Sequence, residues 1–139
     1  MPAQLIRSGR LYSGVPYAYA AAAGPGALVF TAGACPLDTD GAVVGPGDVR
    51  RQAEQVAANL AEALAAAGAQ LSDVLKTTIF VASSNRADLV AAWDVIRAAF
   101  GGHDAPSTLL GVAALGYPGQ LVEAEAVALC GAGTGDAGP

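Results

Sequence analysis

A chain of 139 residues is long enough for one domain around a single core. A content of 53% hydrophobic and only 14% charged residues excludes a disordered or linker protein. The formal net charge is −5 and no run of lysine or arginine occurs, so the chain lacks the basic surface that binds a nucleic acid backbone.

Strands are predicted throughout the first third of the chain. Residues 4–13 suggest an irregular or edge strand, residues 17–23 a second strand after Pro16, and residues 27–32 a third. The apolar run 15–37 has the length of a transmembrane segment, but Gly24-Pro25-Gly26 interrupts it, so we interpret it as two strands and a turn. The first ten residues have no apolar stretch typical of a signal peptide, and we expect a soluble protein.

Two amphipathic helices follow, separated by one strand. After a loop at 38–47, Asp48 can cap the first helix, which is predicted to run to Ala67 with Gly68 as its stop. Residues 75–82 are rich in β-branched side chains and predict a strand. The second helix begins after Ser84 or Asn85 and ends at Phe100. The apolar stripes are Val49, Ala53, Val56, Leu60, Leu64 and Ala67 in the first helix, and Leu89, Trp93, Ile96 and Phe100 in the second.

The last two predicted strands carry the carboxylates of greatest interest. Residues 108–115 are almost entirely apolar, as in a strand covered on both faces, and the turn cluster at 116–119 leads to a strand at 121–129. In that strand Glu123 and Glu125 fall on the face opposite to Val122 and Ala124. A carboxylate in so apolar a strand is costly unless it is paired, hydrated or used, so we expect function here.

The predicted element order is β-β-β-α-β-α-β-β, an α/β (α+β) domain over residues 1–130. We expect one six-stranded mixed sheet with both helices on one face. The other face would be bare and apolar, so we expect the chain to oligomerise through it. Residues 131–139 are expected to be a disordered tail.

Common catalytic motifs are absent from the sequence: it contains no G-x-x-x-x-G-K-[ST], no G-x-S-x-G and no H-E-x-x-H. The single histidine, His103, is interpreted as a solvated loop residue, with a general base paired with Asp104 as the alternative. Cys35 and Cys130 lie far apart, which predicts two reduced thiols in a cytoplasmic protein, with a disulfide as the alternative. With so few ligands we expect no metal site.

Four segments occur in a specific order and spacing. They are VPY at 15–17, VFTAG at 29–33 followed by Pro36, LSDVLKTTIFV at 71–81, and LVEAEAV at 121–127. Together they resemble the Rid family of reactive intermediate deaminases, also called the YjgF family, over about residues 12–130.

The resemblance implies a chorismate-mutase-like fold and a homotrimer with small-molecule pockets in the clefts between subunits. It also implies hydrolysis of enamines and imines to a carbonyl product and ammonia without a cofactor. By the same resemblance Tyr17 and Glu123 are the catalytic residues, which handle the proton and the water. The substrate-binding positions that it implies are Thr31, Gly33, Ala34, Ser107, Thr108 and Leu109.

The family arginine that binds the substrate carboxylate is missing here. Counted back from Gly111, its position holds Ser107; the family motif P-x-R is absent, and the sequence runs Ala105-Pro106-Ser107-Thr108. A hydroxyl cannot reproduce a bidentate, charge-assisted contact to a carboxylate. The candidates for a replacement cation are Arg7, Arg10 and Arg51.

Three functions follow from these observations. The first is a Rid-like enzyme of biosynthetic metabolism that acts on a small imine, enamine or related carbonyl intermediate lacking a carboxylate at the arginine position. The second is a non-catalytic trimer that binds a small molecule or acts as a scaffold. The third is a ribonuclease or translation inhibitor, which the acidic charge and the absence of a basic, aromatic-lined face disfavour. No cofactor, nucleic acid or membrane is expected to take part.

Overall fold

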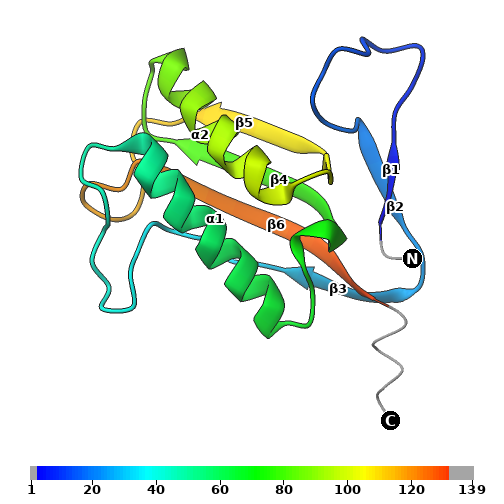
Figure 1. The fold of residues 1–139 in the computed structure, drawn as a ribbon, viewed down its shortest axis with the longest axis horizontal. Coiled ribbons are helices and arrows are strands. Elements are labelled where there is room, and N and C mark those ends of the chain that lie inside the picture. Colours follow the sequence, from blue (N-terminus) through cyan, green and yellow to red (C-terminus); the bar gives the residue numbers. More distant parts are fainter. Residues whose placement is uncertain (1–2, 132–139) are drawn as a thin grey trace.

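Two helices lie side by side on one face of a four-stranded sheet, and a short two-stranded sheet stands beside it (Figure 1). The computed structural model describes residues 3–131. Its elements are β1 (Ala3–Ile6), β2 (Ala20–Ala23), β3 (Gly26–Phe30), α1 (Val49–Ala66), the 3-10 turn η1 (Leu71–Asp73), β4 (Val74–Val81), α2 (Arg86–Phe100), β5 (Ser107–Gly111) and β6 (Val122–Gly131). Helices and strands follow the predicted order. The predicted tail lies outside the described residues except for Gly131, which ends β6 opposite Gly26.

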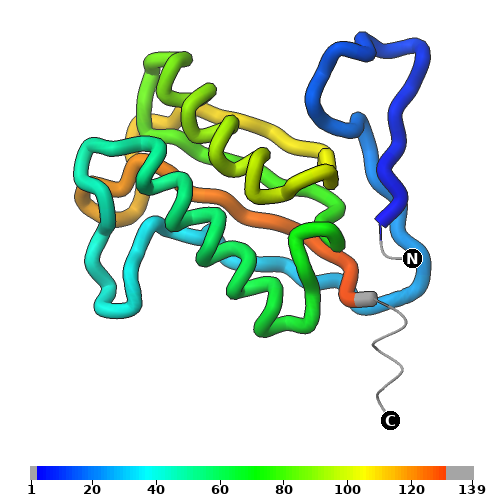
Figure 2. Tube along the Cα trace, in the orientation of Figure 1, coloured from blue at the N-terminus to red at the C-terminus, as the bar shows by residue number. Residues whose placement is uncertain are grey.

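The six strands form two sheets, which corrects the prediction of a single one. The larger sheet has the order β3-β6-β4-β5, and β1 pairs with β2 in the smaller. The larger sheet is mixed, as predicted, because β5 is parallel to β4 while the other neighbours are antiparallel. The four alanines of β2 bring little apolar surface to bury, and Pro25 has no N–H with which to continue a ladder toward β3. Figure 2 shows the chain leaving the small sheet and turning back as β3 along β6.

The first two strands are shorter than predicted. Residues 7–19 form a loop, because Arg7 donates hydrogen bonds from Nη1 to the carbonyl oxygens of Val15 at 3.3 Å and Tyr17 at 2.7 Å. The loop brings Tyr17 and Pro16 next to α2, on the helix side of β5.

The last two strands also differ from the prediction. β5 ends at Gly111 because its partner β4 ends at Val81, whose carbonyl accepts the last bond, from Val112 N, at 2.8 Å. β5 and β6 are not neighbours, since β4 lies between them. The turn at 116–119 therefore carries the chain past the end of β4 instead of closing a hairpin.

Both helices begin with the predicted kind of cap. Asp48 accepts a hydrogen bond from the backbone of Arg51 at 3.0 Å, and Asn85, not Ser84, caps α2 by accepting from Ala87 N at 2.9 Å. Gly68 ends α1 with a φ of +84°, in the left-handed region that favours glycine. The predicted stripe of α1 is buried at Ala53, Val56, Leu60 and Leu64, but its last member, Ala67, is exposed.

The two faces of the four-stranded sheet differ sharply in burial. The face under the helices carries the core, including Val74, Ile79, Val81, Val122 and Ala124, all fully buried. We call the other side the open face; register and strand alternation place on it Leu28, Phe30, Lys76, Thr78, Phe80, Thr108, Leu110, Glu123, Glu125 and Val127. Phe30 on this face is 71% exposed and Leu28 55% exposed, so the uncovered face predicted from sequence is present in the chain, but it is apolar only in part. Within residues 3–131, no helix combines the length and apolar character needed to cross a membrane.

Candidate functional site

Glu123 lies on the open face near the start of β6, opposite Phe80 of β4. The side-chain amide of Gln120 donates to its Oε1 at 3.0 Å, and the Cys35 thiol lies 3.6 Å from the same oxygen. The second oxygen faces Gly33, where a Cβ would stand only 1.9 Å from Oε2. Glu123 is therefore half-buried, with one oxygen held by an amide and the other against a position that has no room for a side chain.

Two buried glutamines fix the segment that leads into Glu123. Gln120 is 3% exposed, and its Oε1 accepts from Tyr117 N at 3.1 Å. Gln52 of α1 is fully buried, donates to Gly119 O at 3.0 Å and accepts from Leu121 N at 2.7 Å. Sequence reasoning missed both residues, although a glutamine next to the apolar stripe of a helix was a usable signal for Gln52.

The segment that carries Gly33 and Cys35 is held from two sides. Ala34 exchanges backbone hydrogen bonds with Ala124 of β6, at 2.6 and 3.2 Å. The Asn59 amide of α1 donates to Cys35 O at 2.8 Å and also to Leu37 O at 2.9 Å. Predicted positions 33 and 34 are thus brought directly to Glu123.

Burial, and after it the negative charge of Glu123, raises the pKa of the Cys35 thiol above its ordinary value. The thiol is therefore protonated at neutral pH and is a weak nucleophile there. Neither Cys35 nor Cys130 forms a disulfide.

Tyr17, Ser107 and Leu109 border a separate groove on the helix side of β5. With Pro16 and Trp93 they line a space of about 340 Å³. The Tyr17 ring meets the Trp93 ring edge to face, with centroids 6.4 Å apart. The side chain of Ser107 donates to Ala105 O at 2.8 Å.

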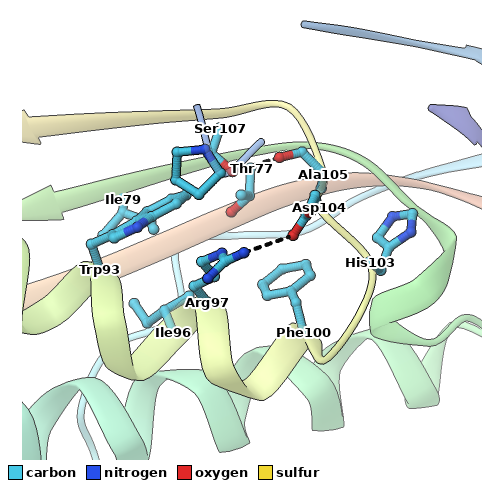
Figure 3. A pocket seen from close by; sticks show the side chains of 11 residues that line it. Thr77, Ile79, Trp93, Ile96, Arg97, Phe100, His103, Asp104, Ala105 and Ser107 are labelled. Carbon is cyan, nitrogen blue, oxygen red and sulfur yellow. Dashed lines mark hydrogen bonds and ion pairs between the residues drawn. The ribbon is translucent and has the colours of Figure 1, made fainter. Parts of the chain in front are cut away.

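The space beneath this groove is core, not a ligand pocket. Figure 3 shows Trp93, Ile96 and Phe100 of α2 facing Thr77 and Ile79 of β4, and only about 10 Å³ remains free among these side chains. This packing agrees with the predicted buried face of the second helix.

Within one chain, the two predicted catalytic residues lie on opposite sides of the sheet. Ser107 pairs with Thr77, which is 2% exposed beneath the helices, and Tyr17 shares its groove, whereas Glu123 belongs to the open face. A cleft between Ser107 and Glu123, as expected from the sequence, therefore requires a second chain.

Thr108 is the member of the Pro106-Ser107-Thr108 segment that shares a face with Glu123. It pairs with Thr78, and the ammonium group of Lys76 donates to its hydroxyl oxygen. Sequence reasoning missed Lys76 because its proximity to Thr108 depends on the parallel pairing of β4 with β5, which residue spacing does not reveal. The other predicted position, Thr31, accepts from Ala126 N at 3.0 Å through its hydroxyl oxygen and lies between β3 and the cluster around Glu123.

His103 and Asp104 have different partners and are not an acid–base pair. His103 is half-buried with Nε2 2.7 Å from Val74 O, so the expectation of a solvated loop histidine is wrong. Asp104 forms ion pairs with Arg7 at 3.0 Å and Arg97 at 3.5 Å (Figure 3 shows the second). Arg7 thereby ties the Tyr17 loop to the end of α2.

Comparison with known proteins gives matches along nearly the whole chain. The family model described as Endoribonuclease L-PSP matches residues 10–130. A RutC family protein of Pyrococcus abyssi is 34% identical over 67 residues, 48% of this chain and about half (53%) of that protein. The 2-iminobutanoate/2-iminopropanoate deaminase of the rat is 32% identical over 103 residues, 74% of this chain and 73% of the rat protein. Among solved structures, the Rid family protein YyfB of Yersinia pestis, whose function is described as unknown, has a TM-score of 0.86 and 33% identity, covering 93% of this chain and 99% of that one.

Proposed function

Because the chain belongs to the Endoribonuclease L-PSP family, the family of the Rid and YjgF proteins, we propose that it is a cofactor-independent enzyme that hydrolyses a small imine, enamine or related carbonyl intermediate. Imine deamination is supported at the family level by the deaminase relatives. The substrate is not held by the arginine clamp of the standard 2-imino acid deaminases, because neither Ser107 nor Thr108 is an arginine.

The observation that carries this proposal is the environment of Glu123. A half-buried carboxylate stands on the open face, where Gln120 donates to one of its oxygens and the backbone of Gly33 lies against the other. Such a carboxylate can take a proton from a water molecule as the water oxygen attacks the imine carbon, and can pass it to the nitrogen to give a carbinolamine. It can then move the hydroxyl proton to the nitrogen as the C–N bond breaks, so that ammonia leaves and the carbonyl forms. The products are then one carbonyl compound and one ammonia for each imine and water consumed.

The proposed assembly is a homotrimer in which the open face of one chain meets the Tyr17 groove of the next. This arrangement would bring Tyr17 and Ser107 of one subunit to Glu123 of another, which a single chain does not do. The Tyr17 hydroxyl would then orient the water or the reacting nitrogen. The exposed Leu28, Phe30 and Leu110 supply apolar surface for the contact.

Two other functions compete with this one. A non-catalytic small-molecule-binding trimer would keep the fold and the cleft but use Glu123 only as a polar contact. A ribonuclease, which the description of the family model names, would have to bind a polyanion with a net charge of −5, so we rank it last.

The test is a turnover assay with imines generated in situ. An amine oxidase supplies imines without a carboxylate on the imine carbon, and an amino acid oxidase supplies 2-imino acids. We expect release of the carbonyl product from at least one class to exceed the uncatalysed rate by about tenfold or more, the scale of general acid–base catalysis. Binding without acceleration in either class would support the non-catalytic alternative, and cleavage of an RNA substrate would support the third.

A further inference from the structure

Lys76 is a cation with spare hydrogen-bonding capacity on the same face as Glu123. It is half-buried, and its ammonium group donates to the neutral hydroxyl of Thr108. Within residues 3–131, the ion pairs all involve Asp104, so Lys76 has no carboxylate partner there. An ammonium group has three protons to donate, and Thr108 keeps its own hydroxyl proton while it accepts.

An irregularity of β4 lies directly before Lys76. The register of β4 against β6 shifts between Val74 and Lys76, so the strand contains a bulge just before Lys76. Bulges re-aim side chains and recur next to functional sites. The hydrogen bond from Lys76 to Thr108 is exposed, so a ligand can reach the remaining protons of the ammonium group.

We propose that Lys76 and Thr108 form the anion-binding end of the site, and that the ligand carries a carboxylate several bonds away from the carbon that reacts near Glu123. Lys76 would bind the ligand carboxylate in place of an arginine at position 107 or 108. This inference adds a substrate class to the proposed function. It rests on the proposed function only where it calls the ligand a substrate; the binding of a carboxylate by Lys76 and Thr108 is a separate claim.

The distance from Thr108 to Glu123 limits the length of the ligand that can reach both. Thr108 pairs with Thr78 and Thr78 with Glu125, so Thr108 lies two strands across the sheet and two residues along from Glu123. Standard strand spacings make this roughly 12 Å between backbones. A 2-imino acid has its carboxylate on the imine carbon itself and is too short to reach both ends. An oxo or imino acid with a short carbon chain between the two groups fits.

A second carboxylate, that of Glu125, limits the negative charge that the ligand can carry. Glu125 lies diagonally across from Lys76 and, with Thr78, lines the same cavity of about 130 Å³. Glu125 repels a dianion such as phosphate about twice as strongly as a single carboxylate, so a monocarboxylate suits Lys76 and Thr108 better.

Binding titrations with defined probes test the inference. The probes are 5-oxohexanoate, its neutral counterpart hexan-2-one, 2-oxobutanoate and inorganic phosphate, with dissociation constants from ligand-observed NMR. We expect the wild-type protein to bind 5-oxohexanoate about tenfold tighter than hexan-2-one, and tighter than 2-oxobutanoate or phosphate. Lys76→Met should abolish the preference over hexan-2-one. Thr108→Val, which removes one donor and keeps the lysine, should reduce it by about threefold.

The matched control is Arg50→Met, which removes an exposed cation from α1 on the opposite side of the sheet and should keep the preference. Similar binding of 5-oxohexanoate and hexan-2-one by the wild-type protein would overturn the inference, as would a Lys76→Met protein that retains the preference. If Lys76→Met does not fold, an unchanged preference in Thr108→Val overturns it. Because these titrations need no turnover, a protein that binds through Lys76 but hydrolyses no imine would contradict the proposed function alone.

Discussion

At the scale of single residues, the charge of Glu123 affects the pKa of the Cys35 thiol. The thiol and the carboxylate are 3.6 Å apart, and the charge of Glu123 contributes to the raised pKa of Cys35 after burial, the larger cause. Because this contact links a reactive probe to the proposed catalytic group, the thiol can be used to monitor Glu123.

We predict that Glu123→Gln makes Cys35 more reactive. Loss of the negative charge lowers the pKa of the thiol, so more thiolate exists at pH 8 and reaction with a disulfide reagent such as DTNB should be several times faster. The measurement uses a Cys130→Ser background, which leaves one thiol. Glu125→Gln is the control, since it makes the same charge change two residues away and should leave the rate unaltered. An unchanged rate in Glu123→Gln would show that the carboxylate does not act on the thiol.

A second prediction concerns the missing arginine. Ser107→Arg should raise turnover of 2-iminobutanoate by about tenfold or more, because the proposed trimer brings position 107 of one subunit to Glu123 of another. Thr108→Arg should not, since Thr108 lies on the open face two strands across from Glu123, too far for a 2-imino acid to reach both. The wild-type rate should remain at least about tenfold below that of the rat deaminase assayed in parallel. Equal rates in the two arginine variants would contradict the face assignment.

The sequence predicted part of this site, and the limits are physical. The resemblance placed Glu123 beside Gly33 and Ala34, and the structure brings these three together. It assigned the position of the missing arginine to Ser107, but it could not show on which side of the sheet this residue lies, because neighbouring strand residues point to opposite faces and a shift of one position reverses the side. Lys76 could not be found, because its neighbour Thr108 is 32 residues away in the chain and only strand pairing joins them.

At the scale of elements, α1 positions the site from the far side of the sheet. Its Gln52 holds the segment that ends in Gln120, and its Asn59 holds the segment that contains Cys35. Both segments flank Glu123, so a helix that carries no proposed catalytic residue determines the geometry.

We predict that Gln52→Leu destabilises the fold. It leaves Leu121 N and the carbonyls of Gly45 and Gly119 without their partner, at a cost of about 3 kcal/mol in the free energy of unfolding. The melting temperature should fall by roughly 10 °C in a thermal scan. Gln55→Leu is the control on the same helix, because it removes only a bond to the neighbouring Asn59 and should change little. A similar loss in both variants would contradict the role assigned to Gln52.

The secondary structure shows which element boundaries can be predicted from neighbouring residues alone. The caps Asp48 and Asn85 and the stop at Gly68 were predicted because each depends on residues next to it. The end of β5 was wrong by several residues because it is set by the end of β4 at Val81, which no local pattern in β5 records. The separation of β2 from the larger sheet was missed for the same reason: pairing is decided between strands.

At the scale of the whole molecule, the open face is the feature that a single chain leaves unexplained. Phe30 and Leu28 are more than half exposed on a sheet whose other face carries the two helices. We predict a trimer, with a mass in sedimentation equilibrium three times the chain mass of 13.6 kDa. A monomer mass at micromolar concentration would remove the shared-cleft model.

Substitution of an exposed apolar residue by aspartate tests the proposed trimer interface. Phe30→Asp should dissociate the trimer, because a carboxylate in an apolar contact has no partner. Ala58→Asp is the control: Ala58 is exposed on α1, lines neither the open face nor the Tyr17 groove, and its change should leave the assembly intact. Dissociation by Ala58→Asp with retention in Phe30→Asp would place the interface on α1 instead.

The most direct test of the central claim, that the chemistry resides at Glu123, is the Glu123→Gln protein measured for both stability and turnover. A glutamine has nearly the same shape, and its carbonyl oxygen can still accept from Gln120. We therefore expect the trimer to persist and the melting temperature to stay unchanged or rise. Turnover of the best imine substrate should fall by at least about tenfold, because an amide cannot move the proton. A variant that melts far below the wild-type protein while keeping full activity would make Glu123 a structural residue and would contradict the account.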